Sequence, residues 1–348
     1  MIAIDFYCGA GGLTKGLINA GIKVLGGYDI CSEYKDTYEK NNKCKFVVED
    51  IRNVDKERIY LDFPSVKGNE DDLLFSGCAP CQPFSKQRRS ANEHADVNLL
   101  FEFGRIVGFI KPAYVLVENV PGLKGRGEKV FNEFISILKK NSYFLSYRVI
   151  NAKDYGVPQN RSRLVLLASR LSQPKIPNGL FGKDKHPYKT VKDAISHFPP
   201  IEAGGTHQKI FNHSASSLSE LNMKRIENTP HSGGDRRSWP TSLVLNCHRK
   251  GHTGHTDVYG RMDWVKVAPT LTAKCFSLSN GRYGHPEQNR AISLREAAAI
   301  QTFGDNYVFY GNRTSIGRQI GNAVPVKLAE ELALYIVDLS RLNNLEAE

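Results

Sequence analysis

The feature that most constrains the fold is a regular alternation of short apolar segments with helical segments over residues 1–170. Seven apolar runs have the length of buried strands: 2–7, 23–25, 46–48, 73–76, 114–117, 144–150 and 164–168. Three segments between them carry apolar residues at helical spacing: 13–20, 99–110 and 130–138. Strands that alternate with helices form parallel sheets covered on both faces. We therefore predict an α/β fold with a doubly wound, mostly parallel sheet.

The character of the chain changes near residue 171. From there to about residue 265, Gly, Pro, Ser, Asn and His dominate without clear periodicity, which predicts a second, smaller, loop-rich domain. Helical spacing returns at 293–300, where Ser293 and Glu296 form a capping box, and a last helix is expected to start near Pro325. The predicted domains are 1–170, 171–265 and a remaining segment 266–348, whose C-terminal part returns to the first domain.

Composition and charge narrow the class of protein. No apolar run reaches the roughly 18 residues of a membrane span, and the N-terminus lacks the basic region of a signal peptide, so we expect a cytoplasmic protein. Seven scattered cysteines, an odd number, argue against a disulfide framework. The net charge of +11 favours a polyanionic partner such as nucleic acid, although a merely basic surface is an alternative.

The segment Gly77–Ser85 follows an apolar run and is punctuated by prolines, as expected of a loop at the carboxyl end of a strand, where open α/β sheets hold their ligands. Pro80 and Pro83 restrict the backbone around Cys81, which is our candidate nucleophile. Two alternatives remain from the residues alone. Cys81 could be a buried apolar residue, or it could form a redox pair with Cys78 in a C-x-x-C motif.

A glycine-rich turn, Cys8–Gly12, directly follows the first predicted strand, so the backbone can approach a ligand at a helix N-terminus. The spacing is not G-x-G-x-x-G, which favours a nucleotide-like cofactor over a pyrophosphate dinucleotide. Asp29 lies at the end of the second predicted strand and Asp50 follows the third, where they are expected to accept hydrogen bonds from a ribose and an adenine amino group. Turn or capping roles are the alternative for each acid.

Glu118 and Asn119 end another apolar strand, so the Glu118 carboxyl group should lie at the same edge of the sheet as Cys81. A carboxylic acid kept protonated by burial can donate to a ring nitrogen. Arg161 and Arg163 precede or begin the strand at 164–168, where surface ion pairing is the alternative to a role in the site.

These segments together resemble the ordered motifs of DNA (cytosine-5) methyltransferases, and the resemblance spans nearly the whole chain. The segments that carry it are Phe6–Gly12, Pro80–Gln82, Glu118–Val120, Gln159–Arg163, Arg295–Ala298 with Gln301, and Gly317–Pro325. The resemblance implies an S-adenosyl-L-methionine-dependent enzyme, of the bacterial or phage modification type, that methylates carbon-5 of a flipped cytosine in double-stranded DNA. The loop-rich module would be the target recognition domain. It also makes the redox alternative for Cys81 much weaker.

The resemblance also assigns roles to individual residues. Cys81 would add to carbon-6, Glu118 would bind ring nitrogen-3, Asn119 would hold the loop, and Arg163, with Arg161 nearby, would bind the exocyclic oxygen. The expected cofactor-binding residues are Phe6, Gly9, Gly11, Gly12, Leu13, Asp29, Ile30, Asp50, Ile51, Gly77, Pro80, Asn322 and Val324. The expected DNA-binding residues are Gln82, Ser85, Arg88 and Arg89 in the catalytic loop, and Arg236, Arg237, Asn246, Arg249 and Arg261 in the module.

Two other functions compete with this one: a tRNA cytosine-5 methyltransferase, and a catalytically silent DNA-binding protein. The long basic module favours DNA, and the presence of Cys81, Glu118 and Arg163 argues against a silent protein. A zinc site at Cys247, His248 and the histidines after them is not expected, because the spacing is unlike that of structural zinc sites. We expect no metal and a monomer, with a cognate restriction endonuclease that acts separately.

Overall fold

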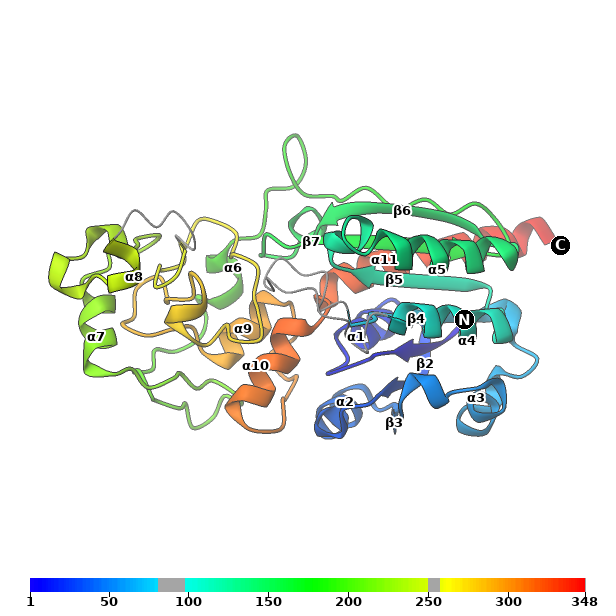
Figure 1. Ribbon diagram of the computed structural model, residues 1–348, viewed down its shortest axis with the longest axis horizontal. Coiled ribbons are helices and arrows are strands. Elements are labelled where there is room, and N and C mark those ends of the chain that lie inside the picture. Colours follow the sequence, from blue (N-terminus) through cyan, green and yellow to red (C-terminus); the bar gives the residue numbers. More distant parts are fainter. Residues whose placement is uncertain (81–97, 250–256, 348) are drawn as a thin grey trace. The chain divides into compact units, whose positions relative to one another are not determined.

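The computed structural model describes residues 1–80, 98–249 and 257–347, except for the side chains of residues 249, 346 and 347. The chain divides into two compact units (Figure 1). The first unit consists of Met1–Tyr155, Ser162–Gly179 and Val324–Glu348, and the second of Gly156–Arg161 and Leu180–Ala323. No helix in the described ranges combines the length and the apolar character needed to cross a membrane.

The first unit is built on a seven-stranded sheet with the strand order β3-β2-β1-β4-β5-β7-β6. The strands are β1 (Ile2–Phe6), β2 (Lys23–Asp29), β3 (Lys45–Val48), β4 (Leu73–Gly77), β5 (Tyr114–Asn119), β6 (Phe144–Asn151) and β7 (Ser162–Ser169). The first five strands pair in parallel, which confirms the predicted α/β sheet. Strand β7 instead runs antiparallel to both β5 and β6. The short link from β6 to β7 contains no crossover helix, and a parallel connection needs one.

Helices cover both faces of this sheet. On one face, α4 (Leu99–Ile110) and α5 (Glu128–Lys140) pack against each other and share a large core with alternate residues of the strands, such as Ile4, Phe6 and Phe75. Helix α3 (Lys56–Asp62) contributes Ile59 to the same core. Elsewhere in the unit, α1 (Gly12–Asn19) packs closely against α11 (Val326–Ala347), and α2 (Lys35–Asn42) precedes β3. The C-terminal helix therefore belongs to the first unit.

The second unit consists mainly of loops and short helical turns. Its α-helices are α6 (Val191–Ile195), α7 (Glu220–Glu227), α8 (Asn246–Arg249), α9 (Leu294–Ile300) and α10 (Arg313–Asn322). Within its described part the only β-structure is a set of isolated bridges. A small core surrounds Trp239, which is 7% exposed.

The second unit differs in extent from residues 171–265. Residues 171–179 belong to the first unit, whereas 266–323 pack within the second. The packing is direct: Arg295, on α9, donates to the Phe211 carbonyl at 3.1 Å, and the Leu294 amide donates to that of Ser214 at 3.3 Å. Helix α9 starts with the predicted capping box of Ser293 and Glu296. Recognition of DNA by this unit stays a prediction.

Candidate active site

The carboxyl ends of the parallel strands β1, β2, β4 and β5 lie at one edge of the sheet of the first unit. The register pairs Phe6 with both Tyr28 and Gly77, and Gly77 with Val117. Because the strands are parallel and in register, the segments that follow Phe6, Gly77 and Asn119 all leave the sheet at this edge. This is the edge at which open α/β sheets bind their ligands.

The glycine-rich turn after β1 has the backbone conformation that the sequence predicts. Gly9 and Gly11 have φ values of +52° and +84°, in the left-handed region, and Gly11 caps α1 without any side-chain hydrogen bond. Asp29 holds this turn, since its Oδ2 accepts a hydrogen bond from the Gly9 amide at 2.9 Å and its Oδ1 accepts one from the Cys31 amide at 2.9 Å. Burial raises the pKa of Asp29. Contact of Asp29 with a ribose stays a prediction.

The aromatic residue that can line the turn is Tyr7 and not Phe6. Phe6 has no exposed surface, and its ring packs among those of Tyr28, Phe75 and Phe103. Phe6 therefore supports the turn from the core, and its role in binding a cofactor stays a prediction. Tyr7 is half-buried, has a φ of +56°, and donates from Oη to the Leu99 carbonyl at 2.5 Å. A left-handed conformation is uncommon at a bulky residue.

A buried polar cluster beneath the turn centres on Asp5. The carboxylate accepts hydrogen bonds from Thr14 Oγ1 at 2.7 Å and from Ser76 Oγ at 2.9 Å. Thr14 Oγ1 is also 3.0 Å from Tyr38 Oη, so the cluster joins β1, β4, α1 and α2. Asp5 is 1% exposed, and this burial raises its pKa to about 7. Asp5 had no role among the predicted site residues.

The other predicted cofactor-binding residues differ in their surroundings. Ile30 is 65% exposed after β2, so its side chain is available to a ligand. Asp50 is paired with Arg52, whose Nε and Nη2 donate to the carboxylate at 2.9 and 2.6 Å, and it also caps the turn that follows. Four predicted residues are largely buried and would contact a ligand mainly through the backbone: Gly12, Leu13, Ile51 and Val324. Asn322 is exposed in the second unit.

Glu118 and Arg163 form a shielded ion pair between β5 and β7. Arg163 Nε lies 2.8 Å from Glu118 Oε1, and the two side chains are 12% and 8% exposed. Arg163 also donates from Nη1 to the Ser162 carbonyl at 2.7 Å. Among the residues that the structure describes, none donates a well-aligned hydrogen bond to the buried Glu118 Oε1. The contact with Arg163 is ionic, so this oxygen can still accept a well-aligned hydrogen bond from a ligand.

Asn119 connects β5 to the segment that leads to Cys81. Its Nδ2 donates to the Ala79 carbonyl at 3.1 Å, and its Oδ1 accepts from the Val120 amide at 2.7 Å. The contact secures the chain two residues before Cys81. Gly77 precedes this segment, and a Cβ there would lie 3.3 Å from the Phe103 ring, which leaves little room for a side chain.

The surroundings of Cys78 do not favour a nucleophilic thiolate. Burial, followed by the negative charge of Glu118, raises the pKa of the Cys78 thiol well above its ordinary value. A protonated thiol is a weak nucleophile. The predicted nucleophile itself, Cys81, lies outside the described residues, together with Gln82, Ser85, Arg88 and Arg89.

Arg161 has a structural environment within the second unit. It is 2% exposed, and its guanidinium donates to the carbonyls of Leu271, Gly321 and Ala323 at 3.0 to 3.1 Å. Gln159 reinforces the same region, because its Oε1 accepts a hydrogen bond from the Leu271 amide at 2.9 Å. A guanidinium committed to backbone carbonyls is not available to a substrate. The predicted catalytic role of Arg161 is therefore corrected to a positioning role.

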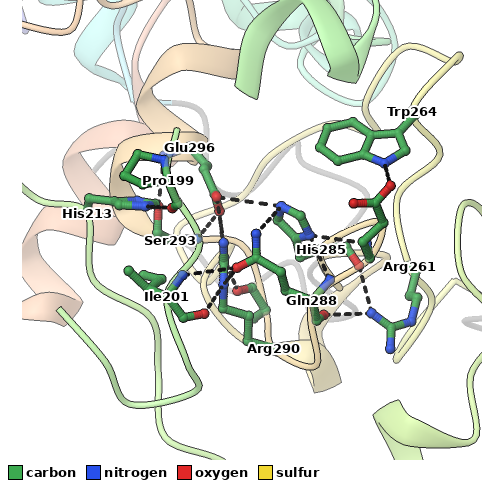
Figure 2. A network of polar contacts seen from close by, with 12 residues as sticks. Pro199, Ile201, His213, Arg261, Trp264, His285, Gln288, Arg290, Ser293 and Glu296 are labelled. Atoms are coloured by element: carbon green, nitrogen blue, oxygen red, sulfur yellow. Dashed lines mark hydrogen bonds and ion pairs between the residues drawn. The ribbon is translucent and has the colours of Figure 1, made fainter. Parts of the chain in front are cut away.

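The burial of Arg261 contradicts its predicted role in contacting DNA bases. It is fully buried, and its guanidinium donates to protein oxygens that include the carbonyls of Thr229, His285 and Gln288 at 2.9, 3.0 and 2.6 Å. Figure 2 shows Arg261 pointing into this network. Its side chain cannot reach a base edge without dismantling the unit. Arg237 and Asn246, in contrast, are exposed, and Arg236 is half-buried. The side chain of Arg249 is not among those that the structure describes.

The same network contains a buried ion pair that holds the unit together (Figure 2). Arg290 donates from Nη1 and Nη2 to the two carboxylate oxygens of Glu296, each at 2.7 Å. His285 lies 3.7 Å from the same carboxylate, and burial lowers its pKa to about 4. Two parallel charge-assisted bonds of this kind are among the strongest in proteins. This cluster therefore has a structural role.

Within the described ranges, no group of three His, Cys, Asp or Glu side chains could hold a metal ion. The histidines that follow Cys247 and His248, His252 and His255, lie outside these ranges. The expectation that this region binds no zinc therefore stays a prediction.

The chain is similar to one protein family along most of its length. The family model described as C-5 cytosine-specific DNA methylase matches residues 1–338. The type II methylase M.HgiDII of Herpetosiphon aurantiacus is 41% identical over 340 residues, covering 96% of this chain and 94% of that protein. The type II methyltransferase M1.HphI of Haemophilus parahaemolyticus is 32% identical, covering 97% and 87%.

Solved structures show the same fold at low sequence identity. A prophage-encoded E. coli protein assigned as a DNA modification methyltransferase matches with a TM-score of 0.73 and 22% identity, covering 98% of this chain and 99% of that chain. The Spodoptera frugiperda DNMT2 structure matches with a TM-score of 0.65 and 16% identity, covering 97% and 99%. These matches extend over both units of the chain.

Proposed function

Because the chain belongs to the C-5 cytosine-specific DNA methylase family and is an S-adenosyl-L-methionine-dependent DNA (cytosine-5) methyltransferase, we propose that Cys81, Glu118 and Arg163 carry out its chemistry. The observation that carries this assignment is the ion pair at the carboxyl end of β5. It leaves Glu118 Oε1 buried, next to a guanidinium, and without a well-aligned donor among the described residues. A cytosine ring protonated at nitrogen-3 would supply that donor.

Cys81 would start the reaction as a thiolate. Carbon-5 of cytosine is a weak nucleophile, and formation of a bond from Cys81 sulfur to carbon-6 moves the electrons of the 5,6 double bond toward carbon-5. Glu118 would hold the proton at ring nitrogen-3, and Arg163 would bind the exocyclic oxygen, so that charge developing on the ring is stabilised. Loss of the carbon-5 proton and cleavage of the bond to Cys81 would then restore the enzyme.

The residues at the sheet edge fit an adenosine cofactor with an amino-acid end. The first turn of α1 begins at a left-handed glycine with no side-chain cap, and such a terminus suits a carboxylate. The exposed Ile30 offers an apolar surface for an adenine ring, and Asp29 lies beside it for a ribose. When bound, S-adenosyl-L-methionine supplies an electrophilic methyl group to carbon-5.

The substrate in this proposal is a specific double-stranded DNA sequence. The target cytosine must leave the base stack, and the residues expected to close over it and its phosphates are Gln82, Ser85, Arg88 and Arg89. The second unit would select the sequence. We further propose that the enzyme acts as a monomer in the cytoplasm, as one half of a restriction-modification pair whose endonuclease acts separately.

Transfer of a labelled methyl group tests the proposal. The purified protein is incubated with labelled S-adenosyl-L-methionine and either duplex DNA or tRNA, and the label is located by nucleoside analysis. We expect 5-methylcytosine in duplex DNA and none in tRNA. Label in tRNA alone would contradict the choice of substrate, and label in neither would contradict catalysis.

A further inference from the structure

The second unit presents an exposed arginine that a buried carboxylate holds in place. Arg237 is 87% exposed and Asp235 is 9% exposed. Arg237 donates to Asp235 from Nε at 2.9 Å and from Nη2 at 2.6 Å, and its backbone amide donates to the same carboxylate at 3.0 Å. The side chain therefore has little freedom even though it lies in solvent.

The loop that carries Asp235 is itself anchored from within the unit. Arg282 Nη1 donates to the carbonyls of Gly233 and Gly234 at 2.8 and 3.1 Å, and its Nη2 lies 3.5 Å from Asp235 Oδ2. Gly234 approaches the chain closely, because a Cβ there would lie 2.2 Å from the Pro230 carbonyl oxygen.

Trp239 anchors the other side of the turn. Its Nε1 donates to Thr229 Oγ1 at 2.8 Å, and its ring lies in the small core of the unit. The hydrogen bonds from Arg237 keep the pKa of Asp235 far below its ordinary value, so the carboxylate stays charged. Arg237 is therefore attached at a short turn that is secured at both ends.

The geometry of the pair leaves one edge of the guanidinium available. Nε and one N–H of Nη2 face Asp235, so Nη1 and the outer N–H of Nη2 point away from it. Among the described residues, no acceptor binds Arg237 Nη1. Two parallel N–H groups at this spacing match the O6 and N7 acceptors of guanine in the major groove.

The local spacing of Asp235 and Arg237 explains their pairing, but not how differently the two side chains are exposed. Asp50 and Arg52 form the same pairing in the first unit, but Asp50 is more exposed than Asp235, at 22%, and Arg52 is less exposed than Arg237, at 48%. The arginine of the second unit is nearly fully exposed on a buried carboxylate, so its outer edge faces solvent, where a ligand can reach it. A side chain ordered before binding loses less entropy when it binds.

We propose that Arg237, oriented by Asp235, contacts a guanine in the recognition sequence. This inference rests on the proposed function, in which the second unit selects the DNA sequence. Arg237 would determine specificity, and Asp235 would be a positioning residue that does not touch DNA. A phosphate contact by Arg237 is the competing possibility, and it would carry no base preference.

The test compares the wild-type enzyme with Arg237→Gln, Asp235→Asn and a matched control, Arg341→Gln. Arg341 forms an exposed pair with Asp338 on α11, outside the second unit, so its replacement removes one positive charge without touching the proposed contact. The methylated sequence is first mapped by bisulfite sequencing. Each guanine of the site is then replaced in turn by 7-deazaguanine, which lacks the N7 acceptor, and kcat/KM for methylation is measured.

We expect one guanine position at which 7-deazaguanine lowers wild-type kcat/KM by about fivefold or more. Arg237→Gln should lose that sensitivity at that position alone, Asp235→Asn should lose part of it, and Arg341→Gln should keep it. Undiminished binding of S-adenosyl-L-methionine by each variant shows that the protein is folded.

The proposal is overturned if Arg237→Gln keeps every sensitivity of the wild type, or if the wild type has none. A loss that is uniform over all sequences, with a shallower salt dependence, would identify a phosphate contact instead. Failure of the proposed function would give a different result from failure of this inference, because the wild-type enzyme would then place no methyl group in duplex DNA.

Discussion

Replacing Asp5 with Asn should remove a pH dependence of stability that the wild-type protein has between about pH 4 and pH 7. The pKa of Asp5 rises from 3.8 to about 7 on folding, because the carboxylate loses its solvent beneath the glycine-rich turn. Between these two values the folded state holds a proton that the unfolded state has released. The free energy of unfolding therefore falls as the pH rises through this window, and the contribution is constant above pH 7.

The magnitude follows from the size of the shift. A difference of about 3 pH units corresponds to about 4 kcal/mol, at 1.36 kcal/mol per unit. Because Asp5 is 1% exposed, solvent screening reduces this figure little. Asn has the shape of a protonated Asp, and the Thr14 and Ser76 hydroxyls can rotate to accept from its amide. The variant should therefore resemble the wild type at pH 4 and be the more stable of the two at pH 8.

Urea unfolding followed by far-ultraviolet circular dichroism measures this difference. The free energy of unfolding is determined for wild type and Asp5→Asn at several values between pH 4 and pH 8, which cancels the pH dependence of all other groups. Asp36→Asn is the matched control, because Asp36 pairs with Lys40 on the exposed face of α2. A difference between wild type and Asp5→Asn that stays constant over this range would refute the reasoning.

Three further predictions concern catalysis and binding. Cys81→Ser should lose methylation and still bind S-adenosyl-L-methionine, because a hydroxyl is too weak a nucleophile at neutral pH. Cys78→Ala should keep its methylation activity. Equal losses of activity in the two variants would support the redox pair. Glu118→Gln should lower kcat by about 10² to 10⁴, with cofactor affinity unchanged in equilibrium dialysis, and a kcat near that of wild type would exclude its role. DNA affinity, measured by filter binding, should fall steeply between 50 and 200 mM salt, while cofactor affinity, measured by calorimetry, stays constant. A DNA affinity that does not change with salt would argue against phosphate contacts by the basic surface.

The sequence predicted the elements whose apolar residues follow a clear period. Helix α4 is an example, because its residues Leu99, Phe103, Ile106 and Ile110 are buried at helical spacing. Helix α2 was not predicted, since its sequence KDTYEKNN has a single large apolar residue, Tyr38. Helices α6 and α8 of the second unit were missed because they have only five and four residues, too few to show a period. Their stability comes from tertiary contacts, which a local pattern does not contain.

The site was predicted unevenly, for physical reasons that differ between residues. The strand ends at Glu118 and Asn119 were found because an apolar run stops there. The burial of Phe6 could have been predicted, because its alternation with Ile4 in β1 indicates a side chain in the core. The burial of Arg261 and Arg161 could not be predicted, because an arginine that donates to backbone carbonyls has no local signature. Those carbonyls lie far away in the sequence.

The most direct test of the account is to trap the covalent bond between the enzyme and its substrate. Duplex DNA with 5-fluorocytosine at the target position is incubated with the enzyme and S-adenosyl-L-methionine, and the linked peptide is identified by mass spectrometry. After methyl transfer, fluorine cannot leave carbon-5 as a proton does, so the bond to carbon-6 persists. We predict a single adduct on Cys81. An adduct on any other cysteine, or methylation of ordinary DNA with no adduct on the fluorinated substrate, would contradict the proposed mechanism.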